Sequence, residues 1–156
     1  PNSVSFTNAT TVVANFTIGT DGTYFIRVEN PDGLAVRSSS AILTVSDAPT
    51  WSTSAGSLGE VAAGASVSLD VDATSDSTVA FSETTSVLTS NSNTPASTMN
   101  LTLNSSTGAI TGTAPSPTSE TTYNFTLRAT DAEAQTADRA FSITISVGMN
   151  NSGQFN

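Results

Sequence analysis

Residues 101–131, LTLNSSTGAITGTAPSPTSETTYNFTLRATD, are the stretch that decides the fold of this chain. Apolar residues alternate with polar ones on both sides of a Ser/Thr-rich turn that ends at Gly108. A loop with Pro115 and Pro117 follows, and neither proline fits a central strand. The alternation then resumes at Tyr123. A period of two residues predicts strands separated by turns and gives no sign of a helix.

The same alternation continues through the rest of the chain and predicts an all-β fold. Before residue 47 we expect about four strands, separated by turns rich in Gly, Pro and Asp. Further on, we expect a polar loop over residues 82–98 with one weak strand near Val87 and Leu88, and a hairpin loop over residues 131–138. The other strands are expected at the alternating apolar rows 67–73, 79–81 and 141–147.

A domain boundary is predicted near Pro49, because proline cannot donate to a sheet ladder. We expect a first domain over residues 1–47, a second over 48–147 and a polar tail over 148–156. The second domain has about seven short strands with turns between them, the pattern of an immunoglobulin-like sandwich. The predicted fold class is therefore all-β, with tandem immunoglobulin-like β-sandwiches. The chain begins at Pro1 without a signal-peptide pattern, so we expect a processed protein or a piece of a longer one.

Composition excludes several classes of function. The net charge is −9, with four arginines and no lysine, so clustered cations for a phosphate backbone or an anionic membrane are missing. No apolar run is long enough to span a bilayer. The chain has no His, Cys or Lys to act as base or nucleophile. A serine hydroxyl without an activating partner is a poor nucleophile. We therefore expect a protein that is not an enzyme and has no catalytic residues.

Three segments carry a resemblance to known families. Residues 103–113, LNSSTGAITGT, and 123–131, YNFTLRATD, resemble the immunoglobulin-like (cadherin-like) repeat of bacterial surface proteins and phage structural proteins. That repeat usually has a Pro-Gly pair before its first leucine, whereas this chain has Thr98-Met99-Asn100. Residues 22–33, GTYFIRVENPDG, resemble the C-terminal part of an IPT/TIG-type immunoglobulin-like domain. The matching segment is shorter than such a domain, so either its start is absent or strands of a partner complete the sheet.

The combination is similar to structural proteins of marine bacteriophages, notably those that infect cyanobacteria. This resemblance implies a non-enzymatic structural or interaction module in a multi-copy virion assembly, as a tail, fibre or capsid decoration protein at the virion surface. Its implied partners are other virion or surface subunits, further copies of itself in a homo-oligomer, and host-surface glycans. Two alternatives stay open: a bacterial cell-surface adhesin or extracellular filament subunit, and an accessory carbohydrate-binding module. The mostly neutral strand edges, without lysine, also favour multi-copy assembly.

Calcium is the one cofactor that the residues suggest. Asp131, Glu133 and Asp138 share the expected hairpin loop, and carboxylates on loops are ligands that calcium prefers. Asp70, Asp72 and Asp76 are further acids that can approach this loop or the domain junction. The linker motif D-x-N-D-N of cadherin-like modules is absent, and a set of solvated loop acids is the simpler interpretation. We thus expect no cofactor, with calcium as the exception to test.

Two aromatic residues are candidates for an interface. The alternation places Phe25 outward, beside Arg27 and Glu29, where it either has no role or contacts the missing part of the domain or a neighbouring subunit. Trp51 opens the second domain and either packs at the end of the sandwich or presents its ring to a partner or a sugar.

Overall fold

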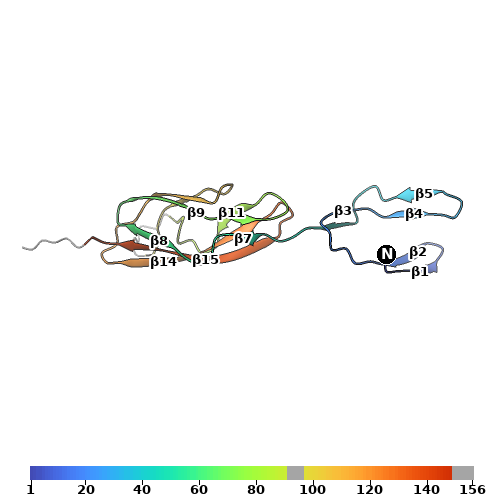
Figure 1. The fold of residues 1–156 in the computed structure, drawn as a ribbon, viewed down its shortest axis with the longest axis horizontal. Coiled ribbons are helices and arrows are strands. Elements are labelled where there is room, and N and C mark those ends of the chain that lie inside the picture. The colour runs from blue at the N-terminus through green and yellow to red at the C-terminus, as the bar shows by residue number, and fades with distance from the viewer. Residues whose placement is uncertain (91–96, 149–156) are drawn as a thin grey trace, which may run out of the picture. The chain divides into compact units, whose positions relative to one another are not determined.

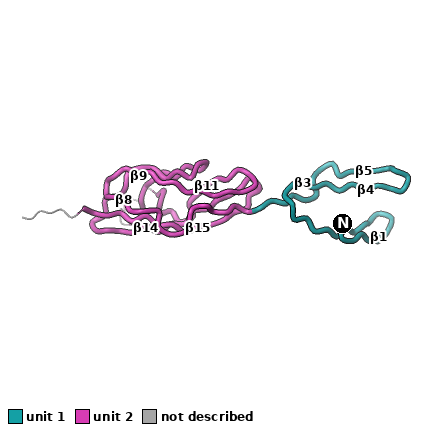
Figure 2. Tube along the Cα trace, in the orientation of Figure 1, with its two compact units in different colours: residues 1–47 teal, residues 48–156 magenta. Residues whose placement is uncertain are grey.

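The computed structural model describes residues 1–90 and 97–148. It divides into two compact units, Pro1–Asp47 (unit 1) and Ala48–Asn156 (unit 2), which Figure 2 colours separately. Every regular element in the described ranges is a β-strand (Figure 1), so the all-β prediction is confirmed. The described residues hold no helix with the length and apolar character that crossing a membrane requires.

Unit 2 is a β-sandwich built from two main sheets and one short strand pair. The larger sheet has the order β11-β14-β15-β8, the smaller one β12-β13-β9, and the short pair is β10-β7. All pairs are antiparallel except β15 and β8, which run parallel. The strands are β7 (Thr50–Trp51), β8 (Gly56–Ala62), β9 (Ser66–Asp70), β10 (Ala73–Thr74), β11 (Ala80–Glu83), β12 (Thr102–Leu103), β13 (Ala109–Thr113), β14 (Thr121–Thr130) and β15 (Thr136–Ser146).

The long hairpin of β14 and β15 supplies most of the core of unit 2. Phe125 pairs directly with Phe141 across the hairpin, and their rings lie 6.2 Å apart between centroids. Alternate residues on both strands point inward and are buried, while their neighbours are exposed or half-buried. They pack against Val67, Val71 and Ile110 of the same core cluster. The predicted inward row 123–129 is therefore correct, because strands that cover a core alternate with period two. The row 141–147 is correct through Ile145, whereas Val147 follows the end of β15 and is half-buried.

The turn before β13 requires a glycine at position 108 because of its backbone geometry. Gly108 has a φ of 74° and donates its N–H to the carbonyl oxygen of Asn104 at 3.0 Å. The Asn104 side chain accepts hydrogen bonds from the N–H groups of Ser106 and Thr107. A Cβ atom at Gly108 would overlap the carbonyl oxygen of Val71. Only glycine fits this turn, for both its dihedral angle and its space.

Two loop predictions in unit 2 need correction. The hairpin loop is shorter than residues 131–138, because β15 already begins at Thr136 and Asp138 pairs with Arg128 in the ladder. Leu88 is not in a strand, yet its side chain is fully buried. Part of the expected polar loop (91–96) and almost all of the expected tail (149–156) lie outside the described residues.

Unit 1 consists of three separate two-stranded sheets. They pair β1 with β2, β3 with β6, and β4 with β5. Six short strands form where we expected about four, and β3 ends at Tyr24 before β4 begins at Arg27. None of the residues 1–47 is buried, since no second layer covers these sheets. The strands are β1 (Ser3–Asn8), β2 (Thr11–Asn15), β3 (Gly22–Tyr24), β4 (Arg27–Glu29), β5 (Ala35–Arg37) and β6 (Leu43–Val45).

Candidate functional site

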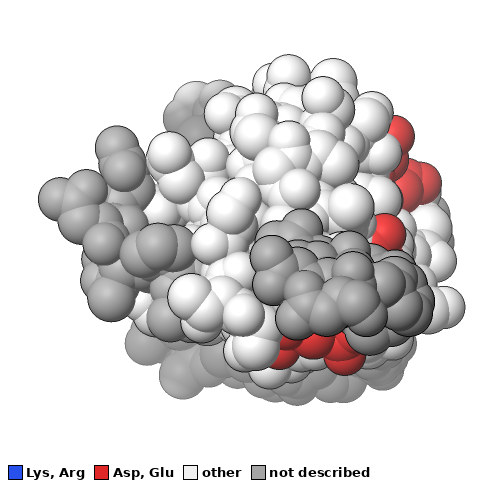
Figure 3. All heavy atoms as spheres, turned by 90° about the vertical axis from the view of Figure 1, so that its left-hand side faces the viewer, with Lys and Arg blue, Asp and Glu red and all other residues white. Residues whose placement is uncertain are grey.

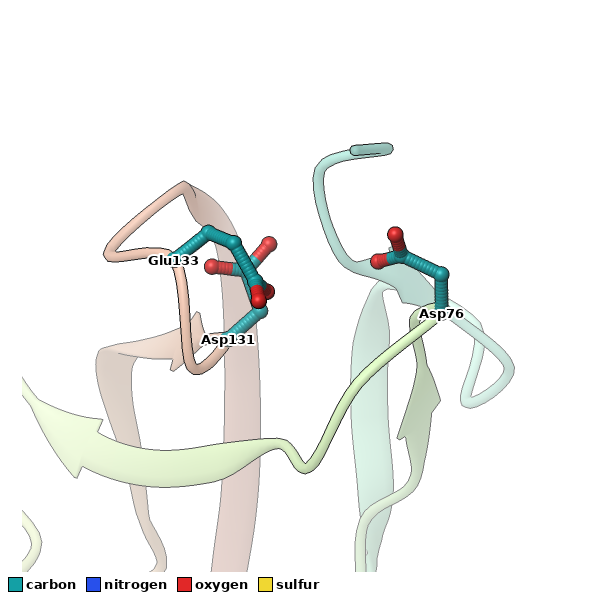
Figure 4. A group of neighbouring side chains, drawn as sticks. All are labelled: Asp76, Asp131 and Glu133. Atoms are coloured by element: carbon teal, nitrogen blue, oxygen red, sulfur yellow. The ribbon is translucent and has the colours of Figure 1, made fainter. Parts of the chain in front are cut away.

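Three carboxylates meet at one end of unit 2. Asp131 and Glu133 lie on the loop between β14 and β15, and Asp76 faces them from the loop between β10 and β11 (Figure 4). One oxygen of each carboxylate lies within 4.8 Å of the other two. The two loops come together because Ala80, just after the first loop, pairs with Thr130 at the end of β14. We call Asp76, Asp131 and Glu133 the acidic group.

Hydrogen bonds hold the hairpin loop of the acidic group in place. The Oδ1 atom of Asp131 accepts the N–H of Gln135 at 2.7 Å, and its carbonyl oxygen accepts the N–H of Ala134 at 3.2 Å. Ser77 joins the two loops, because its hydroxyl donates to Glu133 Oε2 at 2.6 Å and accepts the N–H of Ala132 at 3.1 Å. The hydroxyl of Ser77 thus connects Asp76's loop to the hairpin directly.

Asp131 carries an oxygen that the fold leaves unsatisfied. The residue is 6% exposed, and its Oδ2 atom is buried without a hydrogen-bond partner. A buried carboxylate oxygen without a partner is costly and uncommon in folded proteins. Neither arginine of unit 2 neutralises the negative charge of the acidic group. Arg128 pairs with Asp138, and Arg139 donates to the carbonyl oxygen of Thr53 at 2.6 Å.

The other predicted acids do not join the acidic group. Asp138 lies on β15, where both of its oxygens accept hydrogen bonds from Arg128 at 2.7 and 2.8 Å. These hydrogen bonds from the guanidinium hold the pKa of Asp138 below its usual range. Asp70 and Asp72 are exposed and lie outside the group. Asp131 and Glu133 share one loop, as the sequence predicts. Asp138 instead belongs to a cross-strand pair with Arg128.

Trp51, one of the two interface candidates, lies in the core of unit 2 and is 6% exposed. Its ring packs edge-on against Phe141, with centroids 5.3 Å apart, and tilted against Phe81 at 5.7 Å. Its indole N–H donates to the carbonyl oxygen of Ala137 at 3.0 Å. The ring therefore presents no open face to a partner or a sugar, because the sandwich closes over it.

Phe25, the second interface candidate, borders an apolar groove within unit 1. The ring is 38% exposed and lies under the Arg37 guanidinium, whose carbon is 3.9 Å from the ring centroid. The groove has a volume of about 520 Å³. We call it the unit 1 groove, and its apolar lining includes Val4, Val12, Phe16, Phe25, Ile26 and Val28.

The exposed large apolar side chains of the described residues all belong to unit 1. Phe6 is 74% exposed, Leu34 70% and Val36 68%. Nine more exposed aliphatic and aromatic side chains lie between Val4 and Leu43. Soluble monomers rarely expose so many neighbouring apolar residues, and such surfaces mark interaction sites. Sequence reasoning anticipated Phe25 alone, since alternation assigns one face of a strand to a core whether or not a second layer exists.

Glu83 holds the loop of residues 87–89 through hydrogen bonds, a role that the sequence analysis did not predict. Its Oε1 atom accepts the N–H groups of Val87 at 2.6 Å and Leu88 at 2.8 Å, and Oε2 accepts that of Thr89 at 2.9 Å. Burial by itself raises the pKa of this carboxyl, but the backbone N–H groups outweigh it and hold the pKa below its usual value. The carboxylate fixes the loop that buries Leu88.

The surface of the face shown in Figure 3 is mostly uncharged. Acidic side chains form a few small groups there, and no Lys or Arg is visible among the coloured residues. This agrees with a chain in which 11% of residues are charged and the net charge is −9.

Comparison with known proteins places residues 48–146 in the family described as "Putative Ig domain". The solved structures include PcdhgB3 EC1-4, with 16% identity and a TM-score of 0.49 over 82% of this chain and 40% of that chain. A chimeric titin Z1Z2 has 13% identity and a TM-score of 0.44 over 67% of this chain and 99% of that one. The endo-fucoidan hydrolase MfFcnA4_H294Q of glycoside hydrolase family 107 has 17% identity and a TM-score of 0.48 over 97% of this chain and 23% of that chain. The comparison with curated proteins found no match.

Proposed function

The chain belongs to this family of immunoglobulin-like domains, and on that premise we propose that it is a non-enzymatic structural module of a multi-copy assembly at a virion surface. An immunoglobulin-like domain serves a structural or interaction role by presenting a rigid sandwich. Unit 2 is such a sandwich, with its own buried core. Unit 1 is the part that we assign to assembly, as the C-terminal part of an IPT/TIG-like domain.

One observation carries the proposal: unit 1 exposes an apolar surface that unit 1 itself cannot cover. Its three sheets have two strands each, so every strand has one edge without a partner strand in that sheet. Open edges pair readily with strands of another chain. The unit 1 groove adds an apolar hollow of about 520 Å³ to the same unit. Both features favour a surface that is covered in the assembled state.

A second copy of unit 1 is the occupant that we propose for this surface. Unit 1 holds two of the four arginines and four of the thirteen acidic residues, which is −2 of the total charge of −9. Two copies of unit 1 therefore repel each other weakly, whereas unit 2, with −7, resists association with itself. Arg27 and Glu29 of β4 form an ion pair with each other, and Arg37 of β5 lies over the Phe25 ring, so part of the charge of unit 1 is balanced within the unit.

Sedimentation velocity of the whole chain at increasing concentration tests this assembly. We expect the sedimentation coefficient to rise with concentration, and to stop rising in the double variant Phe16→Ser and Val28→Ser, which makes the unit 1 groove polar. Thr111→Ser, at an exposed position on β13, is the matched control and should associate like the original chain. A chain that sediments as a monomer at every concentration would contradict self-assembly through unit 1.

The genes that neighbour this reading frame test the assignment to a virion. Capsid and tail genes beside it would support the virion proposal. Genes for cell-wall anchoring or filament export would instead favour the bacterial adhesin or filament subunit. A neighbouring glycoside hydrolase gene would favour the carbohydrate-binding module, although the buried ring of Trp51 no longer supports sugar binding there.

A further inference from the structure

We propose that the acidic group of unit 2 is a calcium-binding site, with Asp76, Asp131 and Glu133 as its carboxylate ligands. The inference is independent of the assembly proposed for unit 1. All three residues lie on loops of the same sandwich, so the site needs no other domain or chain to bring them together.

The spacing of the carboxylates fits a calcium ion. Their ligand oxygens all lie within 4.8 Å of one another. Calcium binds oxygens at about 2.3–2.6 Å, so ligands on opposite sides of the ion are up to roughly 5 Å apart. Magnesium binds at about 2.0–2.1 Å with strict octahedral geometry, and it suits such a wide group less well. The donor set contains oxygen only, which excludes a preference for soft metals.

The buried oxygen of Asp131 is the observation that distinguishes this group from ordinary surface acids. Solvated loop acids satisfy their oxygens with water. Asp131 Oδ2 is shielded from water and has no hydrogen-bond donor, while Oδ1 is already used by the N–H of Gln135. In Figure 4 the side chains of Asp131 and Glu133 overlap, and one oxygen of each lies within 4.8 Å of the other. A cation between these carboxylates would satisfy the buried oxygen and neutralise the mutual repulsion of the group.

The surrounding hydrogen bonds prepare the site before an ion arrives. Ser77 holds Glu133 through Oε2, which leaves Oε1 available as a ligand. Asp76 Oδ1 accepts the hydroxyl of Ser75 at 3.0 Å, a hydrogen bond that leaves lone pairs of this carboxylate for an ion. The three carboxylates come from two loops, so an ion bound to all of them would connect the β10–β11 loop to the β14–β15 loop. Calcium should therefore stiffen this end of unit 2.

Isothermal titration of the whole chain with calcium chloride, after treatment with EDTA, tests the site. We expect one ion per chain with a Kd of about 10⁻⁴–10⁻³ M, the range of extracellular calcium modules. Calcium should also raise the midpoint of thermal unfolding as its concentration increases, because it binds the folded state alone. Magnesium at the same concentrations should have a much smaller effect, and an equal response to magnesium would contradict the assignment to calcium.

Asp131→Asn and Asp76→Asn should both remove the calcium response. In EDTA, Asp131→Asn retains an oxygen for the N–H of Gln135, and Asp76 forms no bond that the hairpin loop needs, so both variants should fold. Asp70→Asn is the matched control, since it removes one exposed acid of unit 2 outside the group and should respond like the original chain. No heat of binding and no shift in the original chain would overturn the proposal. An equal loss in the Asp70 variant would overturn it too, because the response would then be a general charge effect.

Discussion

The N–H of Val71 donates to the carbonyl oxygen of Gly108 at 3.1 Å, and a Cβ atom on Gly108 would overlap the carbonyl oxygen of Val71. The turn of residues 104–108 thus lies directly against the backbone that follows β9, the strand that pairs with β13. The close approach of two backbones, and not any chemistry of the turn, accounts for the glycine at this position.

We predict that Gly108→Ala destabilises unit 2 more than Gly64→Ala does. Both glycines have a φ of 74°, so both variants incur the cost of a left-handed alanine, about 1–2 kcal/mol. At Gly64 the nearest atom to a new Cβ is Ser116 Oγ at 3.7 Å, whereas at Gly108 the backbone must move. The additional loss should be about 1–3 kcal/mol, as for overpacking. Denaturant unfolding measures both, and equal losses would contradict the overlap.

Phe125→Ala should cost about 3–5 kcal/mol of unfolding free energy, because it leaves a cavity beside Phe141. Phe125 is 2% exposed. Phe6→Ala is the matched control, since Phe6 is 74% exposed and its loss should change the stability of the monomer by no more than about 0.5 kcal/mol. Thermal unfolding followed by circular dichroism measures both variants. An unchanged midpoint for Phe125→Ala would show that the residue is not in the core.

Trp51→Ala should destabilise unit 2 by about 3–5 kcal/mol, and Trp51→Phe by less. The phenyl ring keeps part of the packing against Phe81 and Phe141 but loses the hydrogen bond to Ala137, which is worth about 1–3 kcal/mol if the carbonyl stays unsatisfied. Circular dichroism during denaturant unfolding measures both losses. Unchanged stability together with lost glycan binding would instead restore Trp51 as a sugar-binding residue.

Much of unit 2 could be predicted from the sequence, because period two reports directly which side chains face a core. The rows through Phe125 and Phe141 and the role of Gly108 follow from local pattern and turn chemistry. The same pattern was less informative in unit 1, where six short strands form instead of about four, because alternation cannot tell whether a second layer exists to cover the apolar face. Only spatial proximity brings Asp76 to Asp131, so the sequence offered this acid merely as one of several.

Stability should depend on pH through Glu83. Backbone N–H groups at Val87, Leu88 and Thr89 lower its pKa in the folded state below the ordinary value of 4.5, despite the opposing effect of burial. The carboxylate therefore stabilises the fold fully above pH 4.5, and this contribution disappears as the pH falls from there through the lowered pKa. Glu83→Ala should be less stable than the original chain at neutral pH by about 1–3 kcal/mol, from the unsatisfied backbone groups. The difference should shrink in acid, when measured by denaturant unfolding between neutral pH and about pH 3.

Glu120→Ala, which removes an acid from an exposed loop position, is the control and should show no such convergence. A difference for Glu83→Ala that stays constant down to the acid limit would mean that the charge of the carboxylate does not hold the loop.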